Sequence, residues 1–379
     1  MGSVKVCKFT GQSQIYLIMD HVENSQEYKG LTVNKGIIQP PTVNPYLVKR
    51  RKKHQYSVSE FVEGIEKGNV SILSQAVTMV ESTNPDHYKI AQEIIEKCLP
   101  LSGHSIRIGI TGVPGAGKST FIEALGMQLV NQGKKLAVLA IDPSSGLSKG
   151  SILGDKTRME SLSVSKDAFI RPSPSAGSLG GVARKTRETI VLCEAAGYNN
   201  VFIETVGVGQ SETAVHSMVD FFLLIQITGA GDELQGIKRG IMEMADAIII
   251  NKAEGNNLEK AKLSQAQYRN ALHLFPAHES GWNPEVMLCS AFHNTGISEI
   301  WEMIGRYFAH TKGNGYFDIK RRRQTQYWMT ETIDEALKNH FYRNPEIEVL
   351  LEDYRKKVVN DEISSFVAAN RLLDKYFNR

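Results

Sequence analysis

Short apolar runs alternate with segments of helical periodicity between residues 105 and about 308. The runs are rich in Val, Ile, Leu and Phe, which is typical of strands buried on both faces of a sheet. Strands that alternate with helices predict an α/β fold with a mostly parallel sheet flanked by helices. The predicted strands are 106–111, 136–141, 168–171, 201–204, 221–227, 247–251 and 286–290. Functional groups are expected at their carboxyl ends, where the βα loops converge.

Helical patterns flank this α/β segment. Before it, Ser57 and Glu60 form a capping-box sequence that opens a helical apolar pattern, and a second amphipathic segment covers 88–99. After it, long helices are predicted for about 322–340 and 345–377. The pattern leaves the role of this C-terminal helical arm open between packing on the same subunit, dimer formation and partner docking.

Residues 1–55 show weak periodicity and contain several prolines, so an extended or disordered arm is predicted there. The basic run at 49–53 is interpreted as a solvated tail rather than a contact for an acidic partner. The chain thus divides into an arm (1–55), an N-terminal helical segment (56–104), an α/β domain (105–312) and the C-terminal arm (313–379).

Composition narrows the class of protein. The chain of 379 residues has 44 Lys and Arg against 41 Asp and Glu, and a net charge of +3 favours neither nucleic acid nor a membrane surface as the main partner. The four cysteines are far apart and form no C-x-x-C pair, which is typical of a reducing compartment. No run reaches the roughly eighteen apolar residues of a membrane span. We therefore expect a cytoplasmic protein.

The strongest chemical signal is a glycine-rich segment between a predicted strand and a predicted helix. Residues 112–119 read GVPGAGKS and match the phosphate-binding pattern G-x-x-x-x-G-K-[ST] at every fixed position. The glycines let backbone N–H groups approach phosphate oxygens, and the following helix presents the positive end of its dipole. Lys118 can reach the β- and γ-phosphates, and the Ser119 hydroxyl can ligate Mg²⁺. The predicted phosphate site, favoured over a merely connecting turn, is Gly112, Gly115, Ala116, Gly117, Lys118, Ser119 and Thr120.

An acidic residue closes another predicted strand. Glu204 is followed by Gly207, in the place where P-loop proteins have a metal-supporting carboxylate and a loop that senses the γ-phosphate. A helix cap or a solvated loop acid is the alternative interpretation. Ras-type GTPases orient the attacking water with a glutamine after this glycine. Here that position is Val208, with Gln210 two residues on, so slow intrinsic hydrolysis is expected.

Two short segments indicate which nucleotide base the site binds. Asn251, Lys252 and Glu254 resemble the guanine-reading N-K-x-D signature, with glutamate in place of aspartate. A carboxylate accepts hydrogen bonds from the guanine N1–H and amine, and adenine offers no such donor pair. Guanine is the expected base, and weaker selectivity through the extra methylene of Glu254 stays open. Ser290, Ala291 and Phe292 follow the last predicted strand, where GTPases contact the base.

Several further motifs make a family resemblance specific. They are IDPSS at 141–145, LGDKTRM at 153–159, RPSP at 171–174, ETVGVGQSE at 204–212 and GDELQG at 231–236. With them, about residues 55–379 resemble the MeaB/ArgK/MMAA family of P-loop GTPases, whose older name is LAO/AO transport system kinase. Family members are chaperones of adenosylcobalamin-dependent methylmalonyl-CoA mutase. The resemblance implies GTP or GDP and Mg²⁺ as cofactors and such a mutase as partner, and a homodimer is the expected assembly.

The resemblance also implies roles for single residues. Lys118 matches the phosphate-contacting lysine, and Asn251, Lys252 and Glu254 match the base-reading residues. The positions of the Mg²⁺ and switch groups are matched by Ser119, Asp142, Asp155 and Glu204, and the catalytic group is Lys118, Asp142 and Glu204. Asp142 and Asp155 have loop capping as an alternative role. Residues 229–240 resemble a further switch that couples nucleotide state to the mutase.

Three functions stay open at this point. The first is a GTPase switch that assists the mutase by cofactor loading or protection. The second is a P-loop kinase that acts on an amino-acid transport protein or a small molecule, and the third is a nucleotide-dependent scaffold with negligible hydrolysis. The base-reading segments favour the GTPase, because a kinase shares only the P-loop.

Overall fold

The computed structural model divides the chain into two units, Met1–Gln55 and Tyr56–Arg379. It describes residues 56–141, 159–172, 179–205, 211–228 and 239–377. The predicted N-terminal arm lies outside the described residues, as do Asp142, Asp155, Val208, Gln210 and residues 229–238. The division of the chain into four parts stays a prediction.

Seven strands form one sheet in the order β3-β2-β4-β1-β5-β6-β7. They are β1 (Ile106–Gly112), β2 (Leu136–Ile141), β3 (Ala168–Arg171), β4 (Asn200–Thr205), β5 (Phe221–Ile227), β6 (Ala247–Asn251) and β7 (Glu285–Leu288). Every pairing between them is parallel, so all the carboxyl ends lie along one edge. The predicted parallel α/β sheet is confirmed. The last strand stops two residues early, because Ser290 exchanges backbone hydrogen bonds with Thr295 instead.

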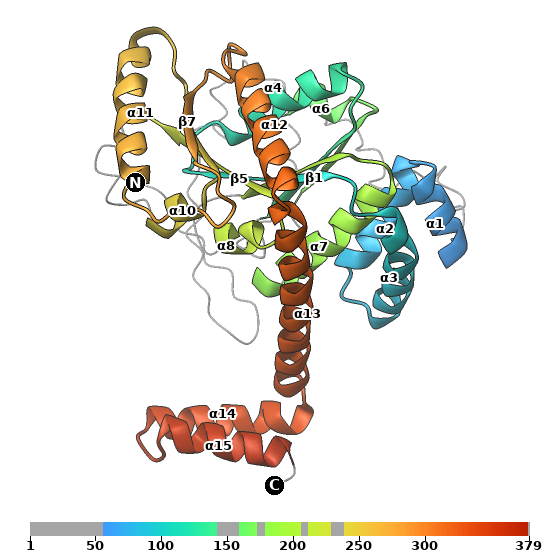
Figure 1. The fold of residues 1–379 in the computed structure, drawn as a ribbon. Coiled ribbons are helices and arrows are strands. Elements are labelled where there is room, and N and C mark those ends of the chain that lie inside the picture. Colours follow the sequence, from blue (N-terminus) through green and yellow to red (C-terminus); the bar gives the residue numbers. More distant parts are fainter. Residues whose placement is uncertain (1–55, 142–158, 173–178, 206–210, 229–238, 378–379) are drawn as a thin grey trace, which may run out of the picture. The chain divides into compact units, whose positions relative to one another are not determined.

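Alternate strand residues point to opposite faces of the sheet, and helices cover both faces (Figure 1). One face packs against α4 (Lys118–Asn131), α6 (Glu160–Ser163) and α12 (Ile297–Gly313), with buried residues that include Ile108, Ile110, Phe202, Leu223 and Ile249. The other face packs against α7 (Leu179–Ala195), α8 (Ser211–His216), α10 (Arg239–Met244) and α11 (Leu258–Leu272), with buried residues that include Val201, Ile203, Phe222, Ile248 and Ile250. This two-sided burial is the reason that the strands read as continuous apolar runs.

Three N-terminal helices extend the second face: α1 (Val58–Glu66), α2 (Val70–Glu81) and α3 (Pro85–Cys98). The predicted capping box is present, because the Ser57 hydroxyl accepts from the Glu60 N–H and the Glu60 carboxylate accepts from the Ser57 N–H. Arg171, at the end of β3, donates from Nε to Glu81 at 2.9 Å. This ion pair joins the end of α2 to the carboxyl edge of the sheet.

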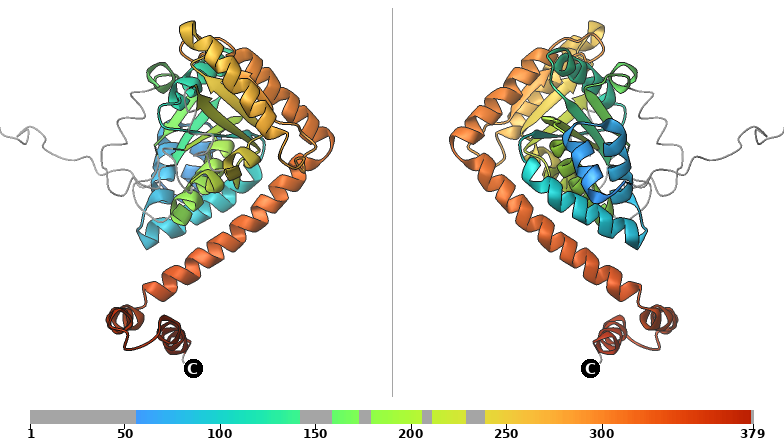
Figure 2. Two further views of the ribbon diagram at one scale, coloured as in Figure 1. Left: turned by 90° about the vertical axis from the view of Figure 1, so that its left-hand side faces the viewer. Right: turned by 90° about the vertical axis from the view of Figure 1, so that its right-hand side faces the viewer.

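The C-terminal arm consists of α13 (Tyr316–Tyr342), α14 (Pro345–Val359) and α15 (Ser365–Tyr376) (Figure 2). The prediction of one helix over 345–377 is wrong. Asp361 has a left-handed backbone (φ 56°), and the Ser364 side chain caps α15 by accepting from the Val367 N–H. Such a cap leaves little trace in an amphipathic pattern. No helix in the described part of the chain is both long and apolar enough for a membrane crossing.

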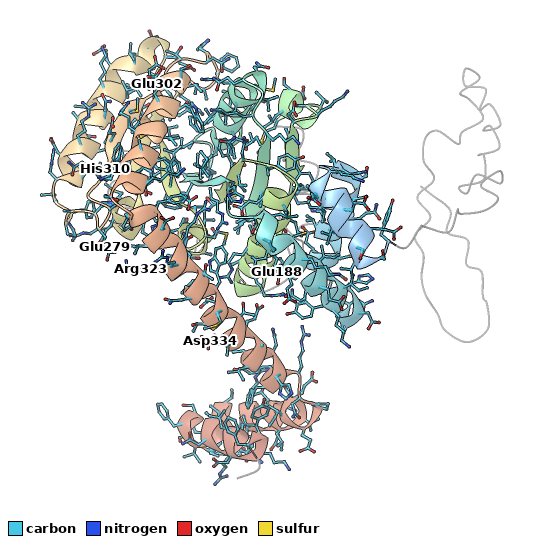
Figure 3. The ribbon with its side chains drawn as sticks, turned by 45° about the vertical axis from the view of Figure 1, so that its right-hand side comes forward. Glu188, Glu279, Glu302, His310, Arg323 and Asp334 are labelled. Carbon is cyan, nitrogen blue, oxygen red and sulfur yellow. The ribbon has the colours of Figure 1, made fainter. Side chains whose placement is uncertain are left out.

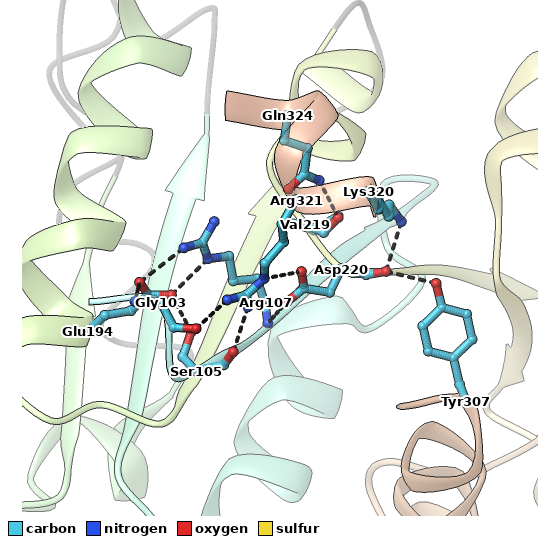
Figure 4. Close-up of polar contacts among 10 residues, drawn as sticks. All are labelled: Gly103, Ser105, Arg107, Glu194, Val219, Asp220, Tyr307, Lys320, Arg321 and Gln324. Atoms are coloured by element: carbon cyan, nitrogen blue, oxygen red, sulfur yellow. Dashed lines mark hydrogen bonds and ion pairs between the residues drawn. The ribbon is translucent and has the colours of Figure 1, made fainter. Parts of the chain in front are cut away.

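The first turns of α13 are anchored at the amino ends of the central strands (Figure 4). Arg321 donates to both carboxylate oxygens of Asp220 at 2.8 and 2.7 Å, and Asp220 also accepts from the Arg107 backbone N–H. Arg107 in turn forms a buried ion pair with Glu194 at 2.8 Å. A more exposed ion pair joins Arg323 of α13 to Glu279 (Figure 3). Helix α13 begins at residue 316 and not near 322, because the chain turns at the left-handed Gly315 and the Asn314 side chain accepts from the Tyr316 N–H.

Candidate nucleotide site

The P-loop joins the central strand β1 to α4, and its glycines are required by geometry. Gly112 has φ 152°, and a Cβ atom there would lie 2.0 Å from the Ile225 carbonyl oxygen. Gly117 has φ 84°, and a Cβ atom there would lie 2.6 Å from Asn251 Nδ2. No other residue type fits either position without movement of the backbone. The loop therefore has the close turn that phosphate binding by backbone N–H groups requires.

The side chain of the P-loop lysine contacts the backbone of its own loop. Lys118 is buried, and its Nζ donates to the carbonyl oxygens of Gly112 at 2.8 Å and Val113 at 3.3 Å. An ammonium group has three donors and no acceptor, so it suits a cluster of phosphate oxygens equally well. Thr120 lies one turn into α4 and is exposed.

Ser119 and Glu204 meet between two neighbouring strands. The Ser119 hydroxyl donates to Glu204 Oε1 at 3.1 Å, and Glu204 is buried at the end of β4. The register pairs Glu204 with Ile110 of β1, and below the site the Thr205 hydroxyl donates to the Thr111 hydroxyl at 2.9 Å. A hydroxyl and a carboxylate fit Mg²⁺, which protein sites hold with one or two carboxylates together with water and phosphate oxygens. The described residues contain no cluster of three or more His, Cys, Asp or Glu suited to a metal, and Asp142 and Asp155 lie outside them.

Asn251 connects the P-loop to the other half of the site. Its Nδ2 donates to the Ala116 carbonyl at 2.8 Å, and its Oδ1 accepts from the Ala291 N–H at 3.0 Å. The Cys289 thiol donates to the same Oδ1 at 3.3 Å. Burial, with the nearby charge of Glu254, raises the pKa of this thiol to about 12, so it stays a donor at neutral pH. Asn251 thus fixes three loops relative to one another.

Glu254 is held by Ser290. The Ser290 hydroxyl donates to Glu254 Oε2, and the His293 ring lies 3.7 Å from the same oxygen. Lys252 is exposed, with a left-handed backbone (φ 58°), and Phe292 is 78% exposed. A left-handed non-glycine residue is strained, which is typical of functional loops.

The structure brings most of the predicted residues to one edge of the sheet. The phosphate group of residues, Glu204 and the base-reading residues all lie at or just beyond the carboxyl ends of β1, β4, β6 and β7. The hydroxyl pair of Thr111 and Thr205 and the thiol of Cys289 were not among the residues predicted for the site. The only sequence signal for these residues is that they directly adjoin predicted site residues.

A P-loop on the central strand of a parallel sheet, with an acid from the next strand beside it, defines a P-loop NTPase. The family model described as "Methylmalonyl Co-A mutase-associated GTPase MeaB" matches residues 73–346. The chain belongs to this family of GTPases, so the predicted family and GTP hydrolysis are confirmed at that level.

Individual relatives agree with this assignment. A putative GTPase of Caulobacter vibrioides is 50% identical over 307 residues, which cover 81% of this chain and 94% of the relative. GTPase ArgK of Escherichia coli is 43% identical, with 82% and 94% covered. The mouse protein named "Methylmalonic aciduria type A homolog, mitochondrial" is 43% identical, with 86% and 81% covered. A crystal structure named "LAO/AO transport system kinase" superposes with a TM-score of 0.68 at 36% identity, over 85% of this chain and 98% of the other.

Proposed function

We propose that this GTPase is a nucleotide-dependent switch that assists an adenosylcobalamin-dependent methylmalonyl-CoA mutase by loading or protecting its cofactor. The observation that carries the switch is the contact between Ser119 of the P-loop and Glu204 of β4 at 3.1 Å. Glu204 lies two residues before residues 206–210, so a change at the γ-phosphate acts on a residue close to this segment of the chain. The mutase is inferred from the description of the family to which the chain belongs.

The chemistry assigned to the site is positioning and charge neutralisation. Lys118 binds the β- and γ-phosphate oxygens, and backbone N–H groups of residues 112–120 surround them. Ser119 and Glu204 would hold Mg²⁺, with Asp142 and Asp155 as the further proposed carboxylates, and the bound ion neutralises phosphate charge. Asn251, Lys252 and Glu254 read guanine, and the backbone of 290–292 borders the base.

Slow intrinsic hydrolysis belongs to the same proposal, since Val208 cannot orient a water molecule. The measurement is phosphate release from GTP by the monodisperse protein, alone and with the mutase. We expect slow release alone and faster release with the mutase. Rapid turnover by the isolated chain would refute this part.

The mutase assignment is tested by co-elution. The protein is mixed with an adenosylcobalamin-dependent methylmalonyl-CoA mutase and passed over a sizing column in GDP or in a non-hydrolysable GTP analogue. A complex whose amount differs between the two nucleotides supports the switch. If the mutase neither binds nor changes its activity in either nucleotide, the assignment fails while GTP hydrolysis stands.

A second candidate function is phosphoryl transfer to an acceptor, because a solved relative is named a kinase. Product analysis with labelled GTP separates the two. Free phosphate with no labelled acceptor supports the GTPase switch, and stoichiometric label on an amino acid or a transport protein supports the kinase. Binding of GTP without release of either product supports a scaffold.

The assembly and the compartment complete the proposal. A homodimer through the C-terminal arm is supported by apolar side chains of α13 that solvent reaches: Met329, Ile333 and Leu337 are 62%, 50% and 60% exposed. The cytoplasm is the proposed compartment, since the cysteines show no sign of a disulfide framework.

A further inference from the structure

Two threonine hydroxyls meet directly behind the nucleotide site. The Thr205 hydroxyl donates to the Thr111 hydroxyl at 2.9 Å, and the two residues are 0% and 2% exposed. Thr111 directly precedes Gly112 of the P-loop. Thr205 directly follows Glu204. The pair therefore joins the strand that enters the P-loop to the strand that carries the carboxylate.

The backbone ladder between these two strands ends just before the pair. The last register pair of β1 with β4 is Ile110 with Glu204. Beyond it each strand keeps a partner on its other side, since β1 stays paired with β5, and β4 with β2. The hydroxyl pair thus continues the contact between β1 and β4 at the level where their ladder stops.

The pair lies on the face of the sheet opposite to the carboxylate. Glu204 faces α4, so the next residue, Thr205, faces α8. A Cβ atom at Gly109, two residues before Thr111, would lie 2.8 Å from the Val215 side chain of α8, so Thr111 shares that face. The buried pair can therefore act on the site only through the spacing of the two strands.

Two hydroxyls allow a closer approach of the strands than two apolar groups do. The hydroxyl oxygens are 2.9 Å apart, whereas two methyl carbons in contact lie about 3.5–4.0 Å apart. Two methyl groups in place of the hydroxyls would therefore widen this spacing by up to about 1 Å. Such a change matters, because a misplacement of about 1 Å can lower the rate of an enzyme about 100-fold.

We propose that Thr111 and Thr205 are positioning residues for GTP hydrolysis. Their hydroxyl pair sets the distance between the P-loop and the carboxylate of Glu204. It thereby sets the geometry in which Ser119 and Glu204 would hold Mg²⁺. The inference rests on this role of Glu204, which belongs to the proposed function.

The test compares the variants Thr111→Val and Thr205→Val with the double variant. Valine keeps the branched shape and removes the hydroxyl. Each single variant leaves a buried hydroxyl without this partner and should lower the urea midpoint, whereas the double variant should regain a midpoint near that of the wild type. GTP hydrolysis by the full chain should fall about tenfold in the single variants and stay equally low in the double variant, because the spacing is not restored.

Two binding measurements by calorimetry accompany the rates. Affinity for Mg²⁺ in the presence of a non-hydrolysable GTP analogue should fall about tenfold in all three variants. Affinity for GDP in EDTA should stay unchanged, because the P-loop itself is intact.

Two further variants serve as controls. Thr311 is 1% exposed, and its hydroxyl donates to the Tyr307 carbonyl within α12, so Thr311→Val should hydrolyse GTP at the wild-type rate even if its midpoint falls. Thr205→Ser keeps the hydroxyl and should retain both hydrolysis and Mg²⁺ affinity.

Hydrolysis that recovers together with the midpoint in the double variant would show a merely structural pair and overturn the inference. Wild-type rates in both single variants would also overturn it, and a loss of hydrolysis in Glu204→Gln would then leave the proposed function standing. A wild-type rate in Glu204→Gln would instead refute the proposed role of Glu204, and the inference with it. If a single variant does not fold, the double variant decides, since it contains neither hydroxyl.

Discussion

Ser119 and Glu204 are recognised from different features of the sequence. The serine belongs to the P-loop motif, whereas the glutamate only closes an apolar run. What joins them is the β1–β4 register, which places Glu204 beside Ile110, the residue two places before Gly112. The proposed role of this carboxylate, which lies 3.1 Å from the P-loop hydroxyl, is to support the cation of a bound triphosphate.

Changing Glu204 to Gln keeps the shape of the side chain and removes its charge. We expect GTP hydrolysis to fall about 100-fold, because an electrostatic contribution to the transition state is lost. The Mg²⁺ concentration that gives half of the maximal rate should rise about tenfold. Titration of the hydrolysis rate with Mg²⁺ measures both, and GDP binding in EDTA should be unchanged.

Glu299→Gln is the control, because Glu299 is exposed on α12. Unchanged hydrolysis and Mg²⁺ dependence in Glu204→Gln would remove Glu204 from the metal site.

Most single residues of the site could be predicted from the sequence, because fixed spacings carry them. Lys118 and Ser119 follow from the P-loop pattern, and Glu204 and Asn251 follow from strand ends. The partners that hold these residues could not be predicted. Cys289 and Ser290 act on Asn251 and Glu254 from almost 40 residues away, and only the pairing of β6 with β7 brings them together.

At the scale of elements, α13 is the clearest case of an anchored helix. Arg321 in its first turns is held by Asp220, whose side chain is 1% exposed. The aromatic ring of Trp328, two turns further on, lies within 6 Å of both Arg107 and Arg187. Its indole N–H donates to the Ser217 carbonyl at 3.0 Å. The base of the arm is thus bound mainly through polar groups.

The anchor predicts a large stability loss in Arg321→Ala. Removing this partner leaves the buried Asp220 carboxylate with an uncompensated charge, which costs about 3–5 kcal/mol. The adjacent Arg322 is exposed, so Arg322→Ala should change the free energy of unfolding by less than about 0.5 kcal/mol. Urea denaturation followed by circular dichroism measures both. Equal midpoints for the two variants would show that the anchor contributes nothing.

Helix α8 ends in a half-buried histidine, His216, whose protonation lowers the stability of the fold. Burial, together with the charges of Lys320 and His278, lowers the pKa of His216 to about 4. The folded form therefore binds the proton less well than the unfolded form, whose pKa is near 6.5. Stability from the neutral ring is present above about pH 6.5 and is lost as the pH falls towards 4. Between pH 7 and pH 5 the loss amounts to about 2 kcal/mol.

Substitution isolates this contribution. His216→Gln should flatten the decline in unfolding free energy between pH 7 and pH 5, whereas His273→Gln, at an exposed position, should leave it unchanged. Chemical denaturation at several pH values gives the slopes. A slope in His216→Gln as steep as that of the wild type would contradict the assignment.

The elements themselves were largely predictable. All seven strands lie within about two residues of their predicted bounds, since strands buried on both faces leave strong apolar runs. The arm was harder to predict, because α13 is buried mainly through polar side chains and the break before α15 depends on a side-chain cap. The spacing of apolar residues reflects apolar burial only, so it indicates neither the polar contacts of α13 nor the cap of α15.

At the scale of the whole described unit, the nucleotide site lies at the carboxyl ends of the central strands, and the arm binds at their amino ends. The carboxyl end of β1 continues into the P-loop, and the segment that enters β5 at its amino end binds the arm. Gln324 donates to the Val219 carbonyl at 2.7 Å, and Trp328 donates to the Ser217 carbonyl. These carbonyls directly follow α8, which follows residues 206–210. The chain between residues 206–210 and the carbonyls that bind the arm is therefore short.

The outer part of α13 carries the last prediction. Met329, Ile333 and Leu337 recur every four residues and therefore share one helix face, and each is at least half exposed. A row of exposed apolar side chains on a long helix is the kind of surface that a second copy buries, since two such rows are self-complementary about a two-fold axis. Leu337→Glu places a charge within that contact, where desolvation without a partner is costly.

We expect Leu337→Glu to convert a dimer into a monomer at micromolar concentration, with GTP hydrolysis retained. Asn339→Glu introduces the same residue about 200° around the helix and should leave the dimer intact. Light scattering coupled to a sizing column gives the masses. A wild type that has the mass of one chain would refute the homodimer, and a dimer that survives Leu337→Glu would place the dimer contact on another surface.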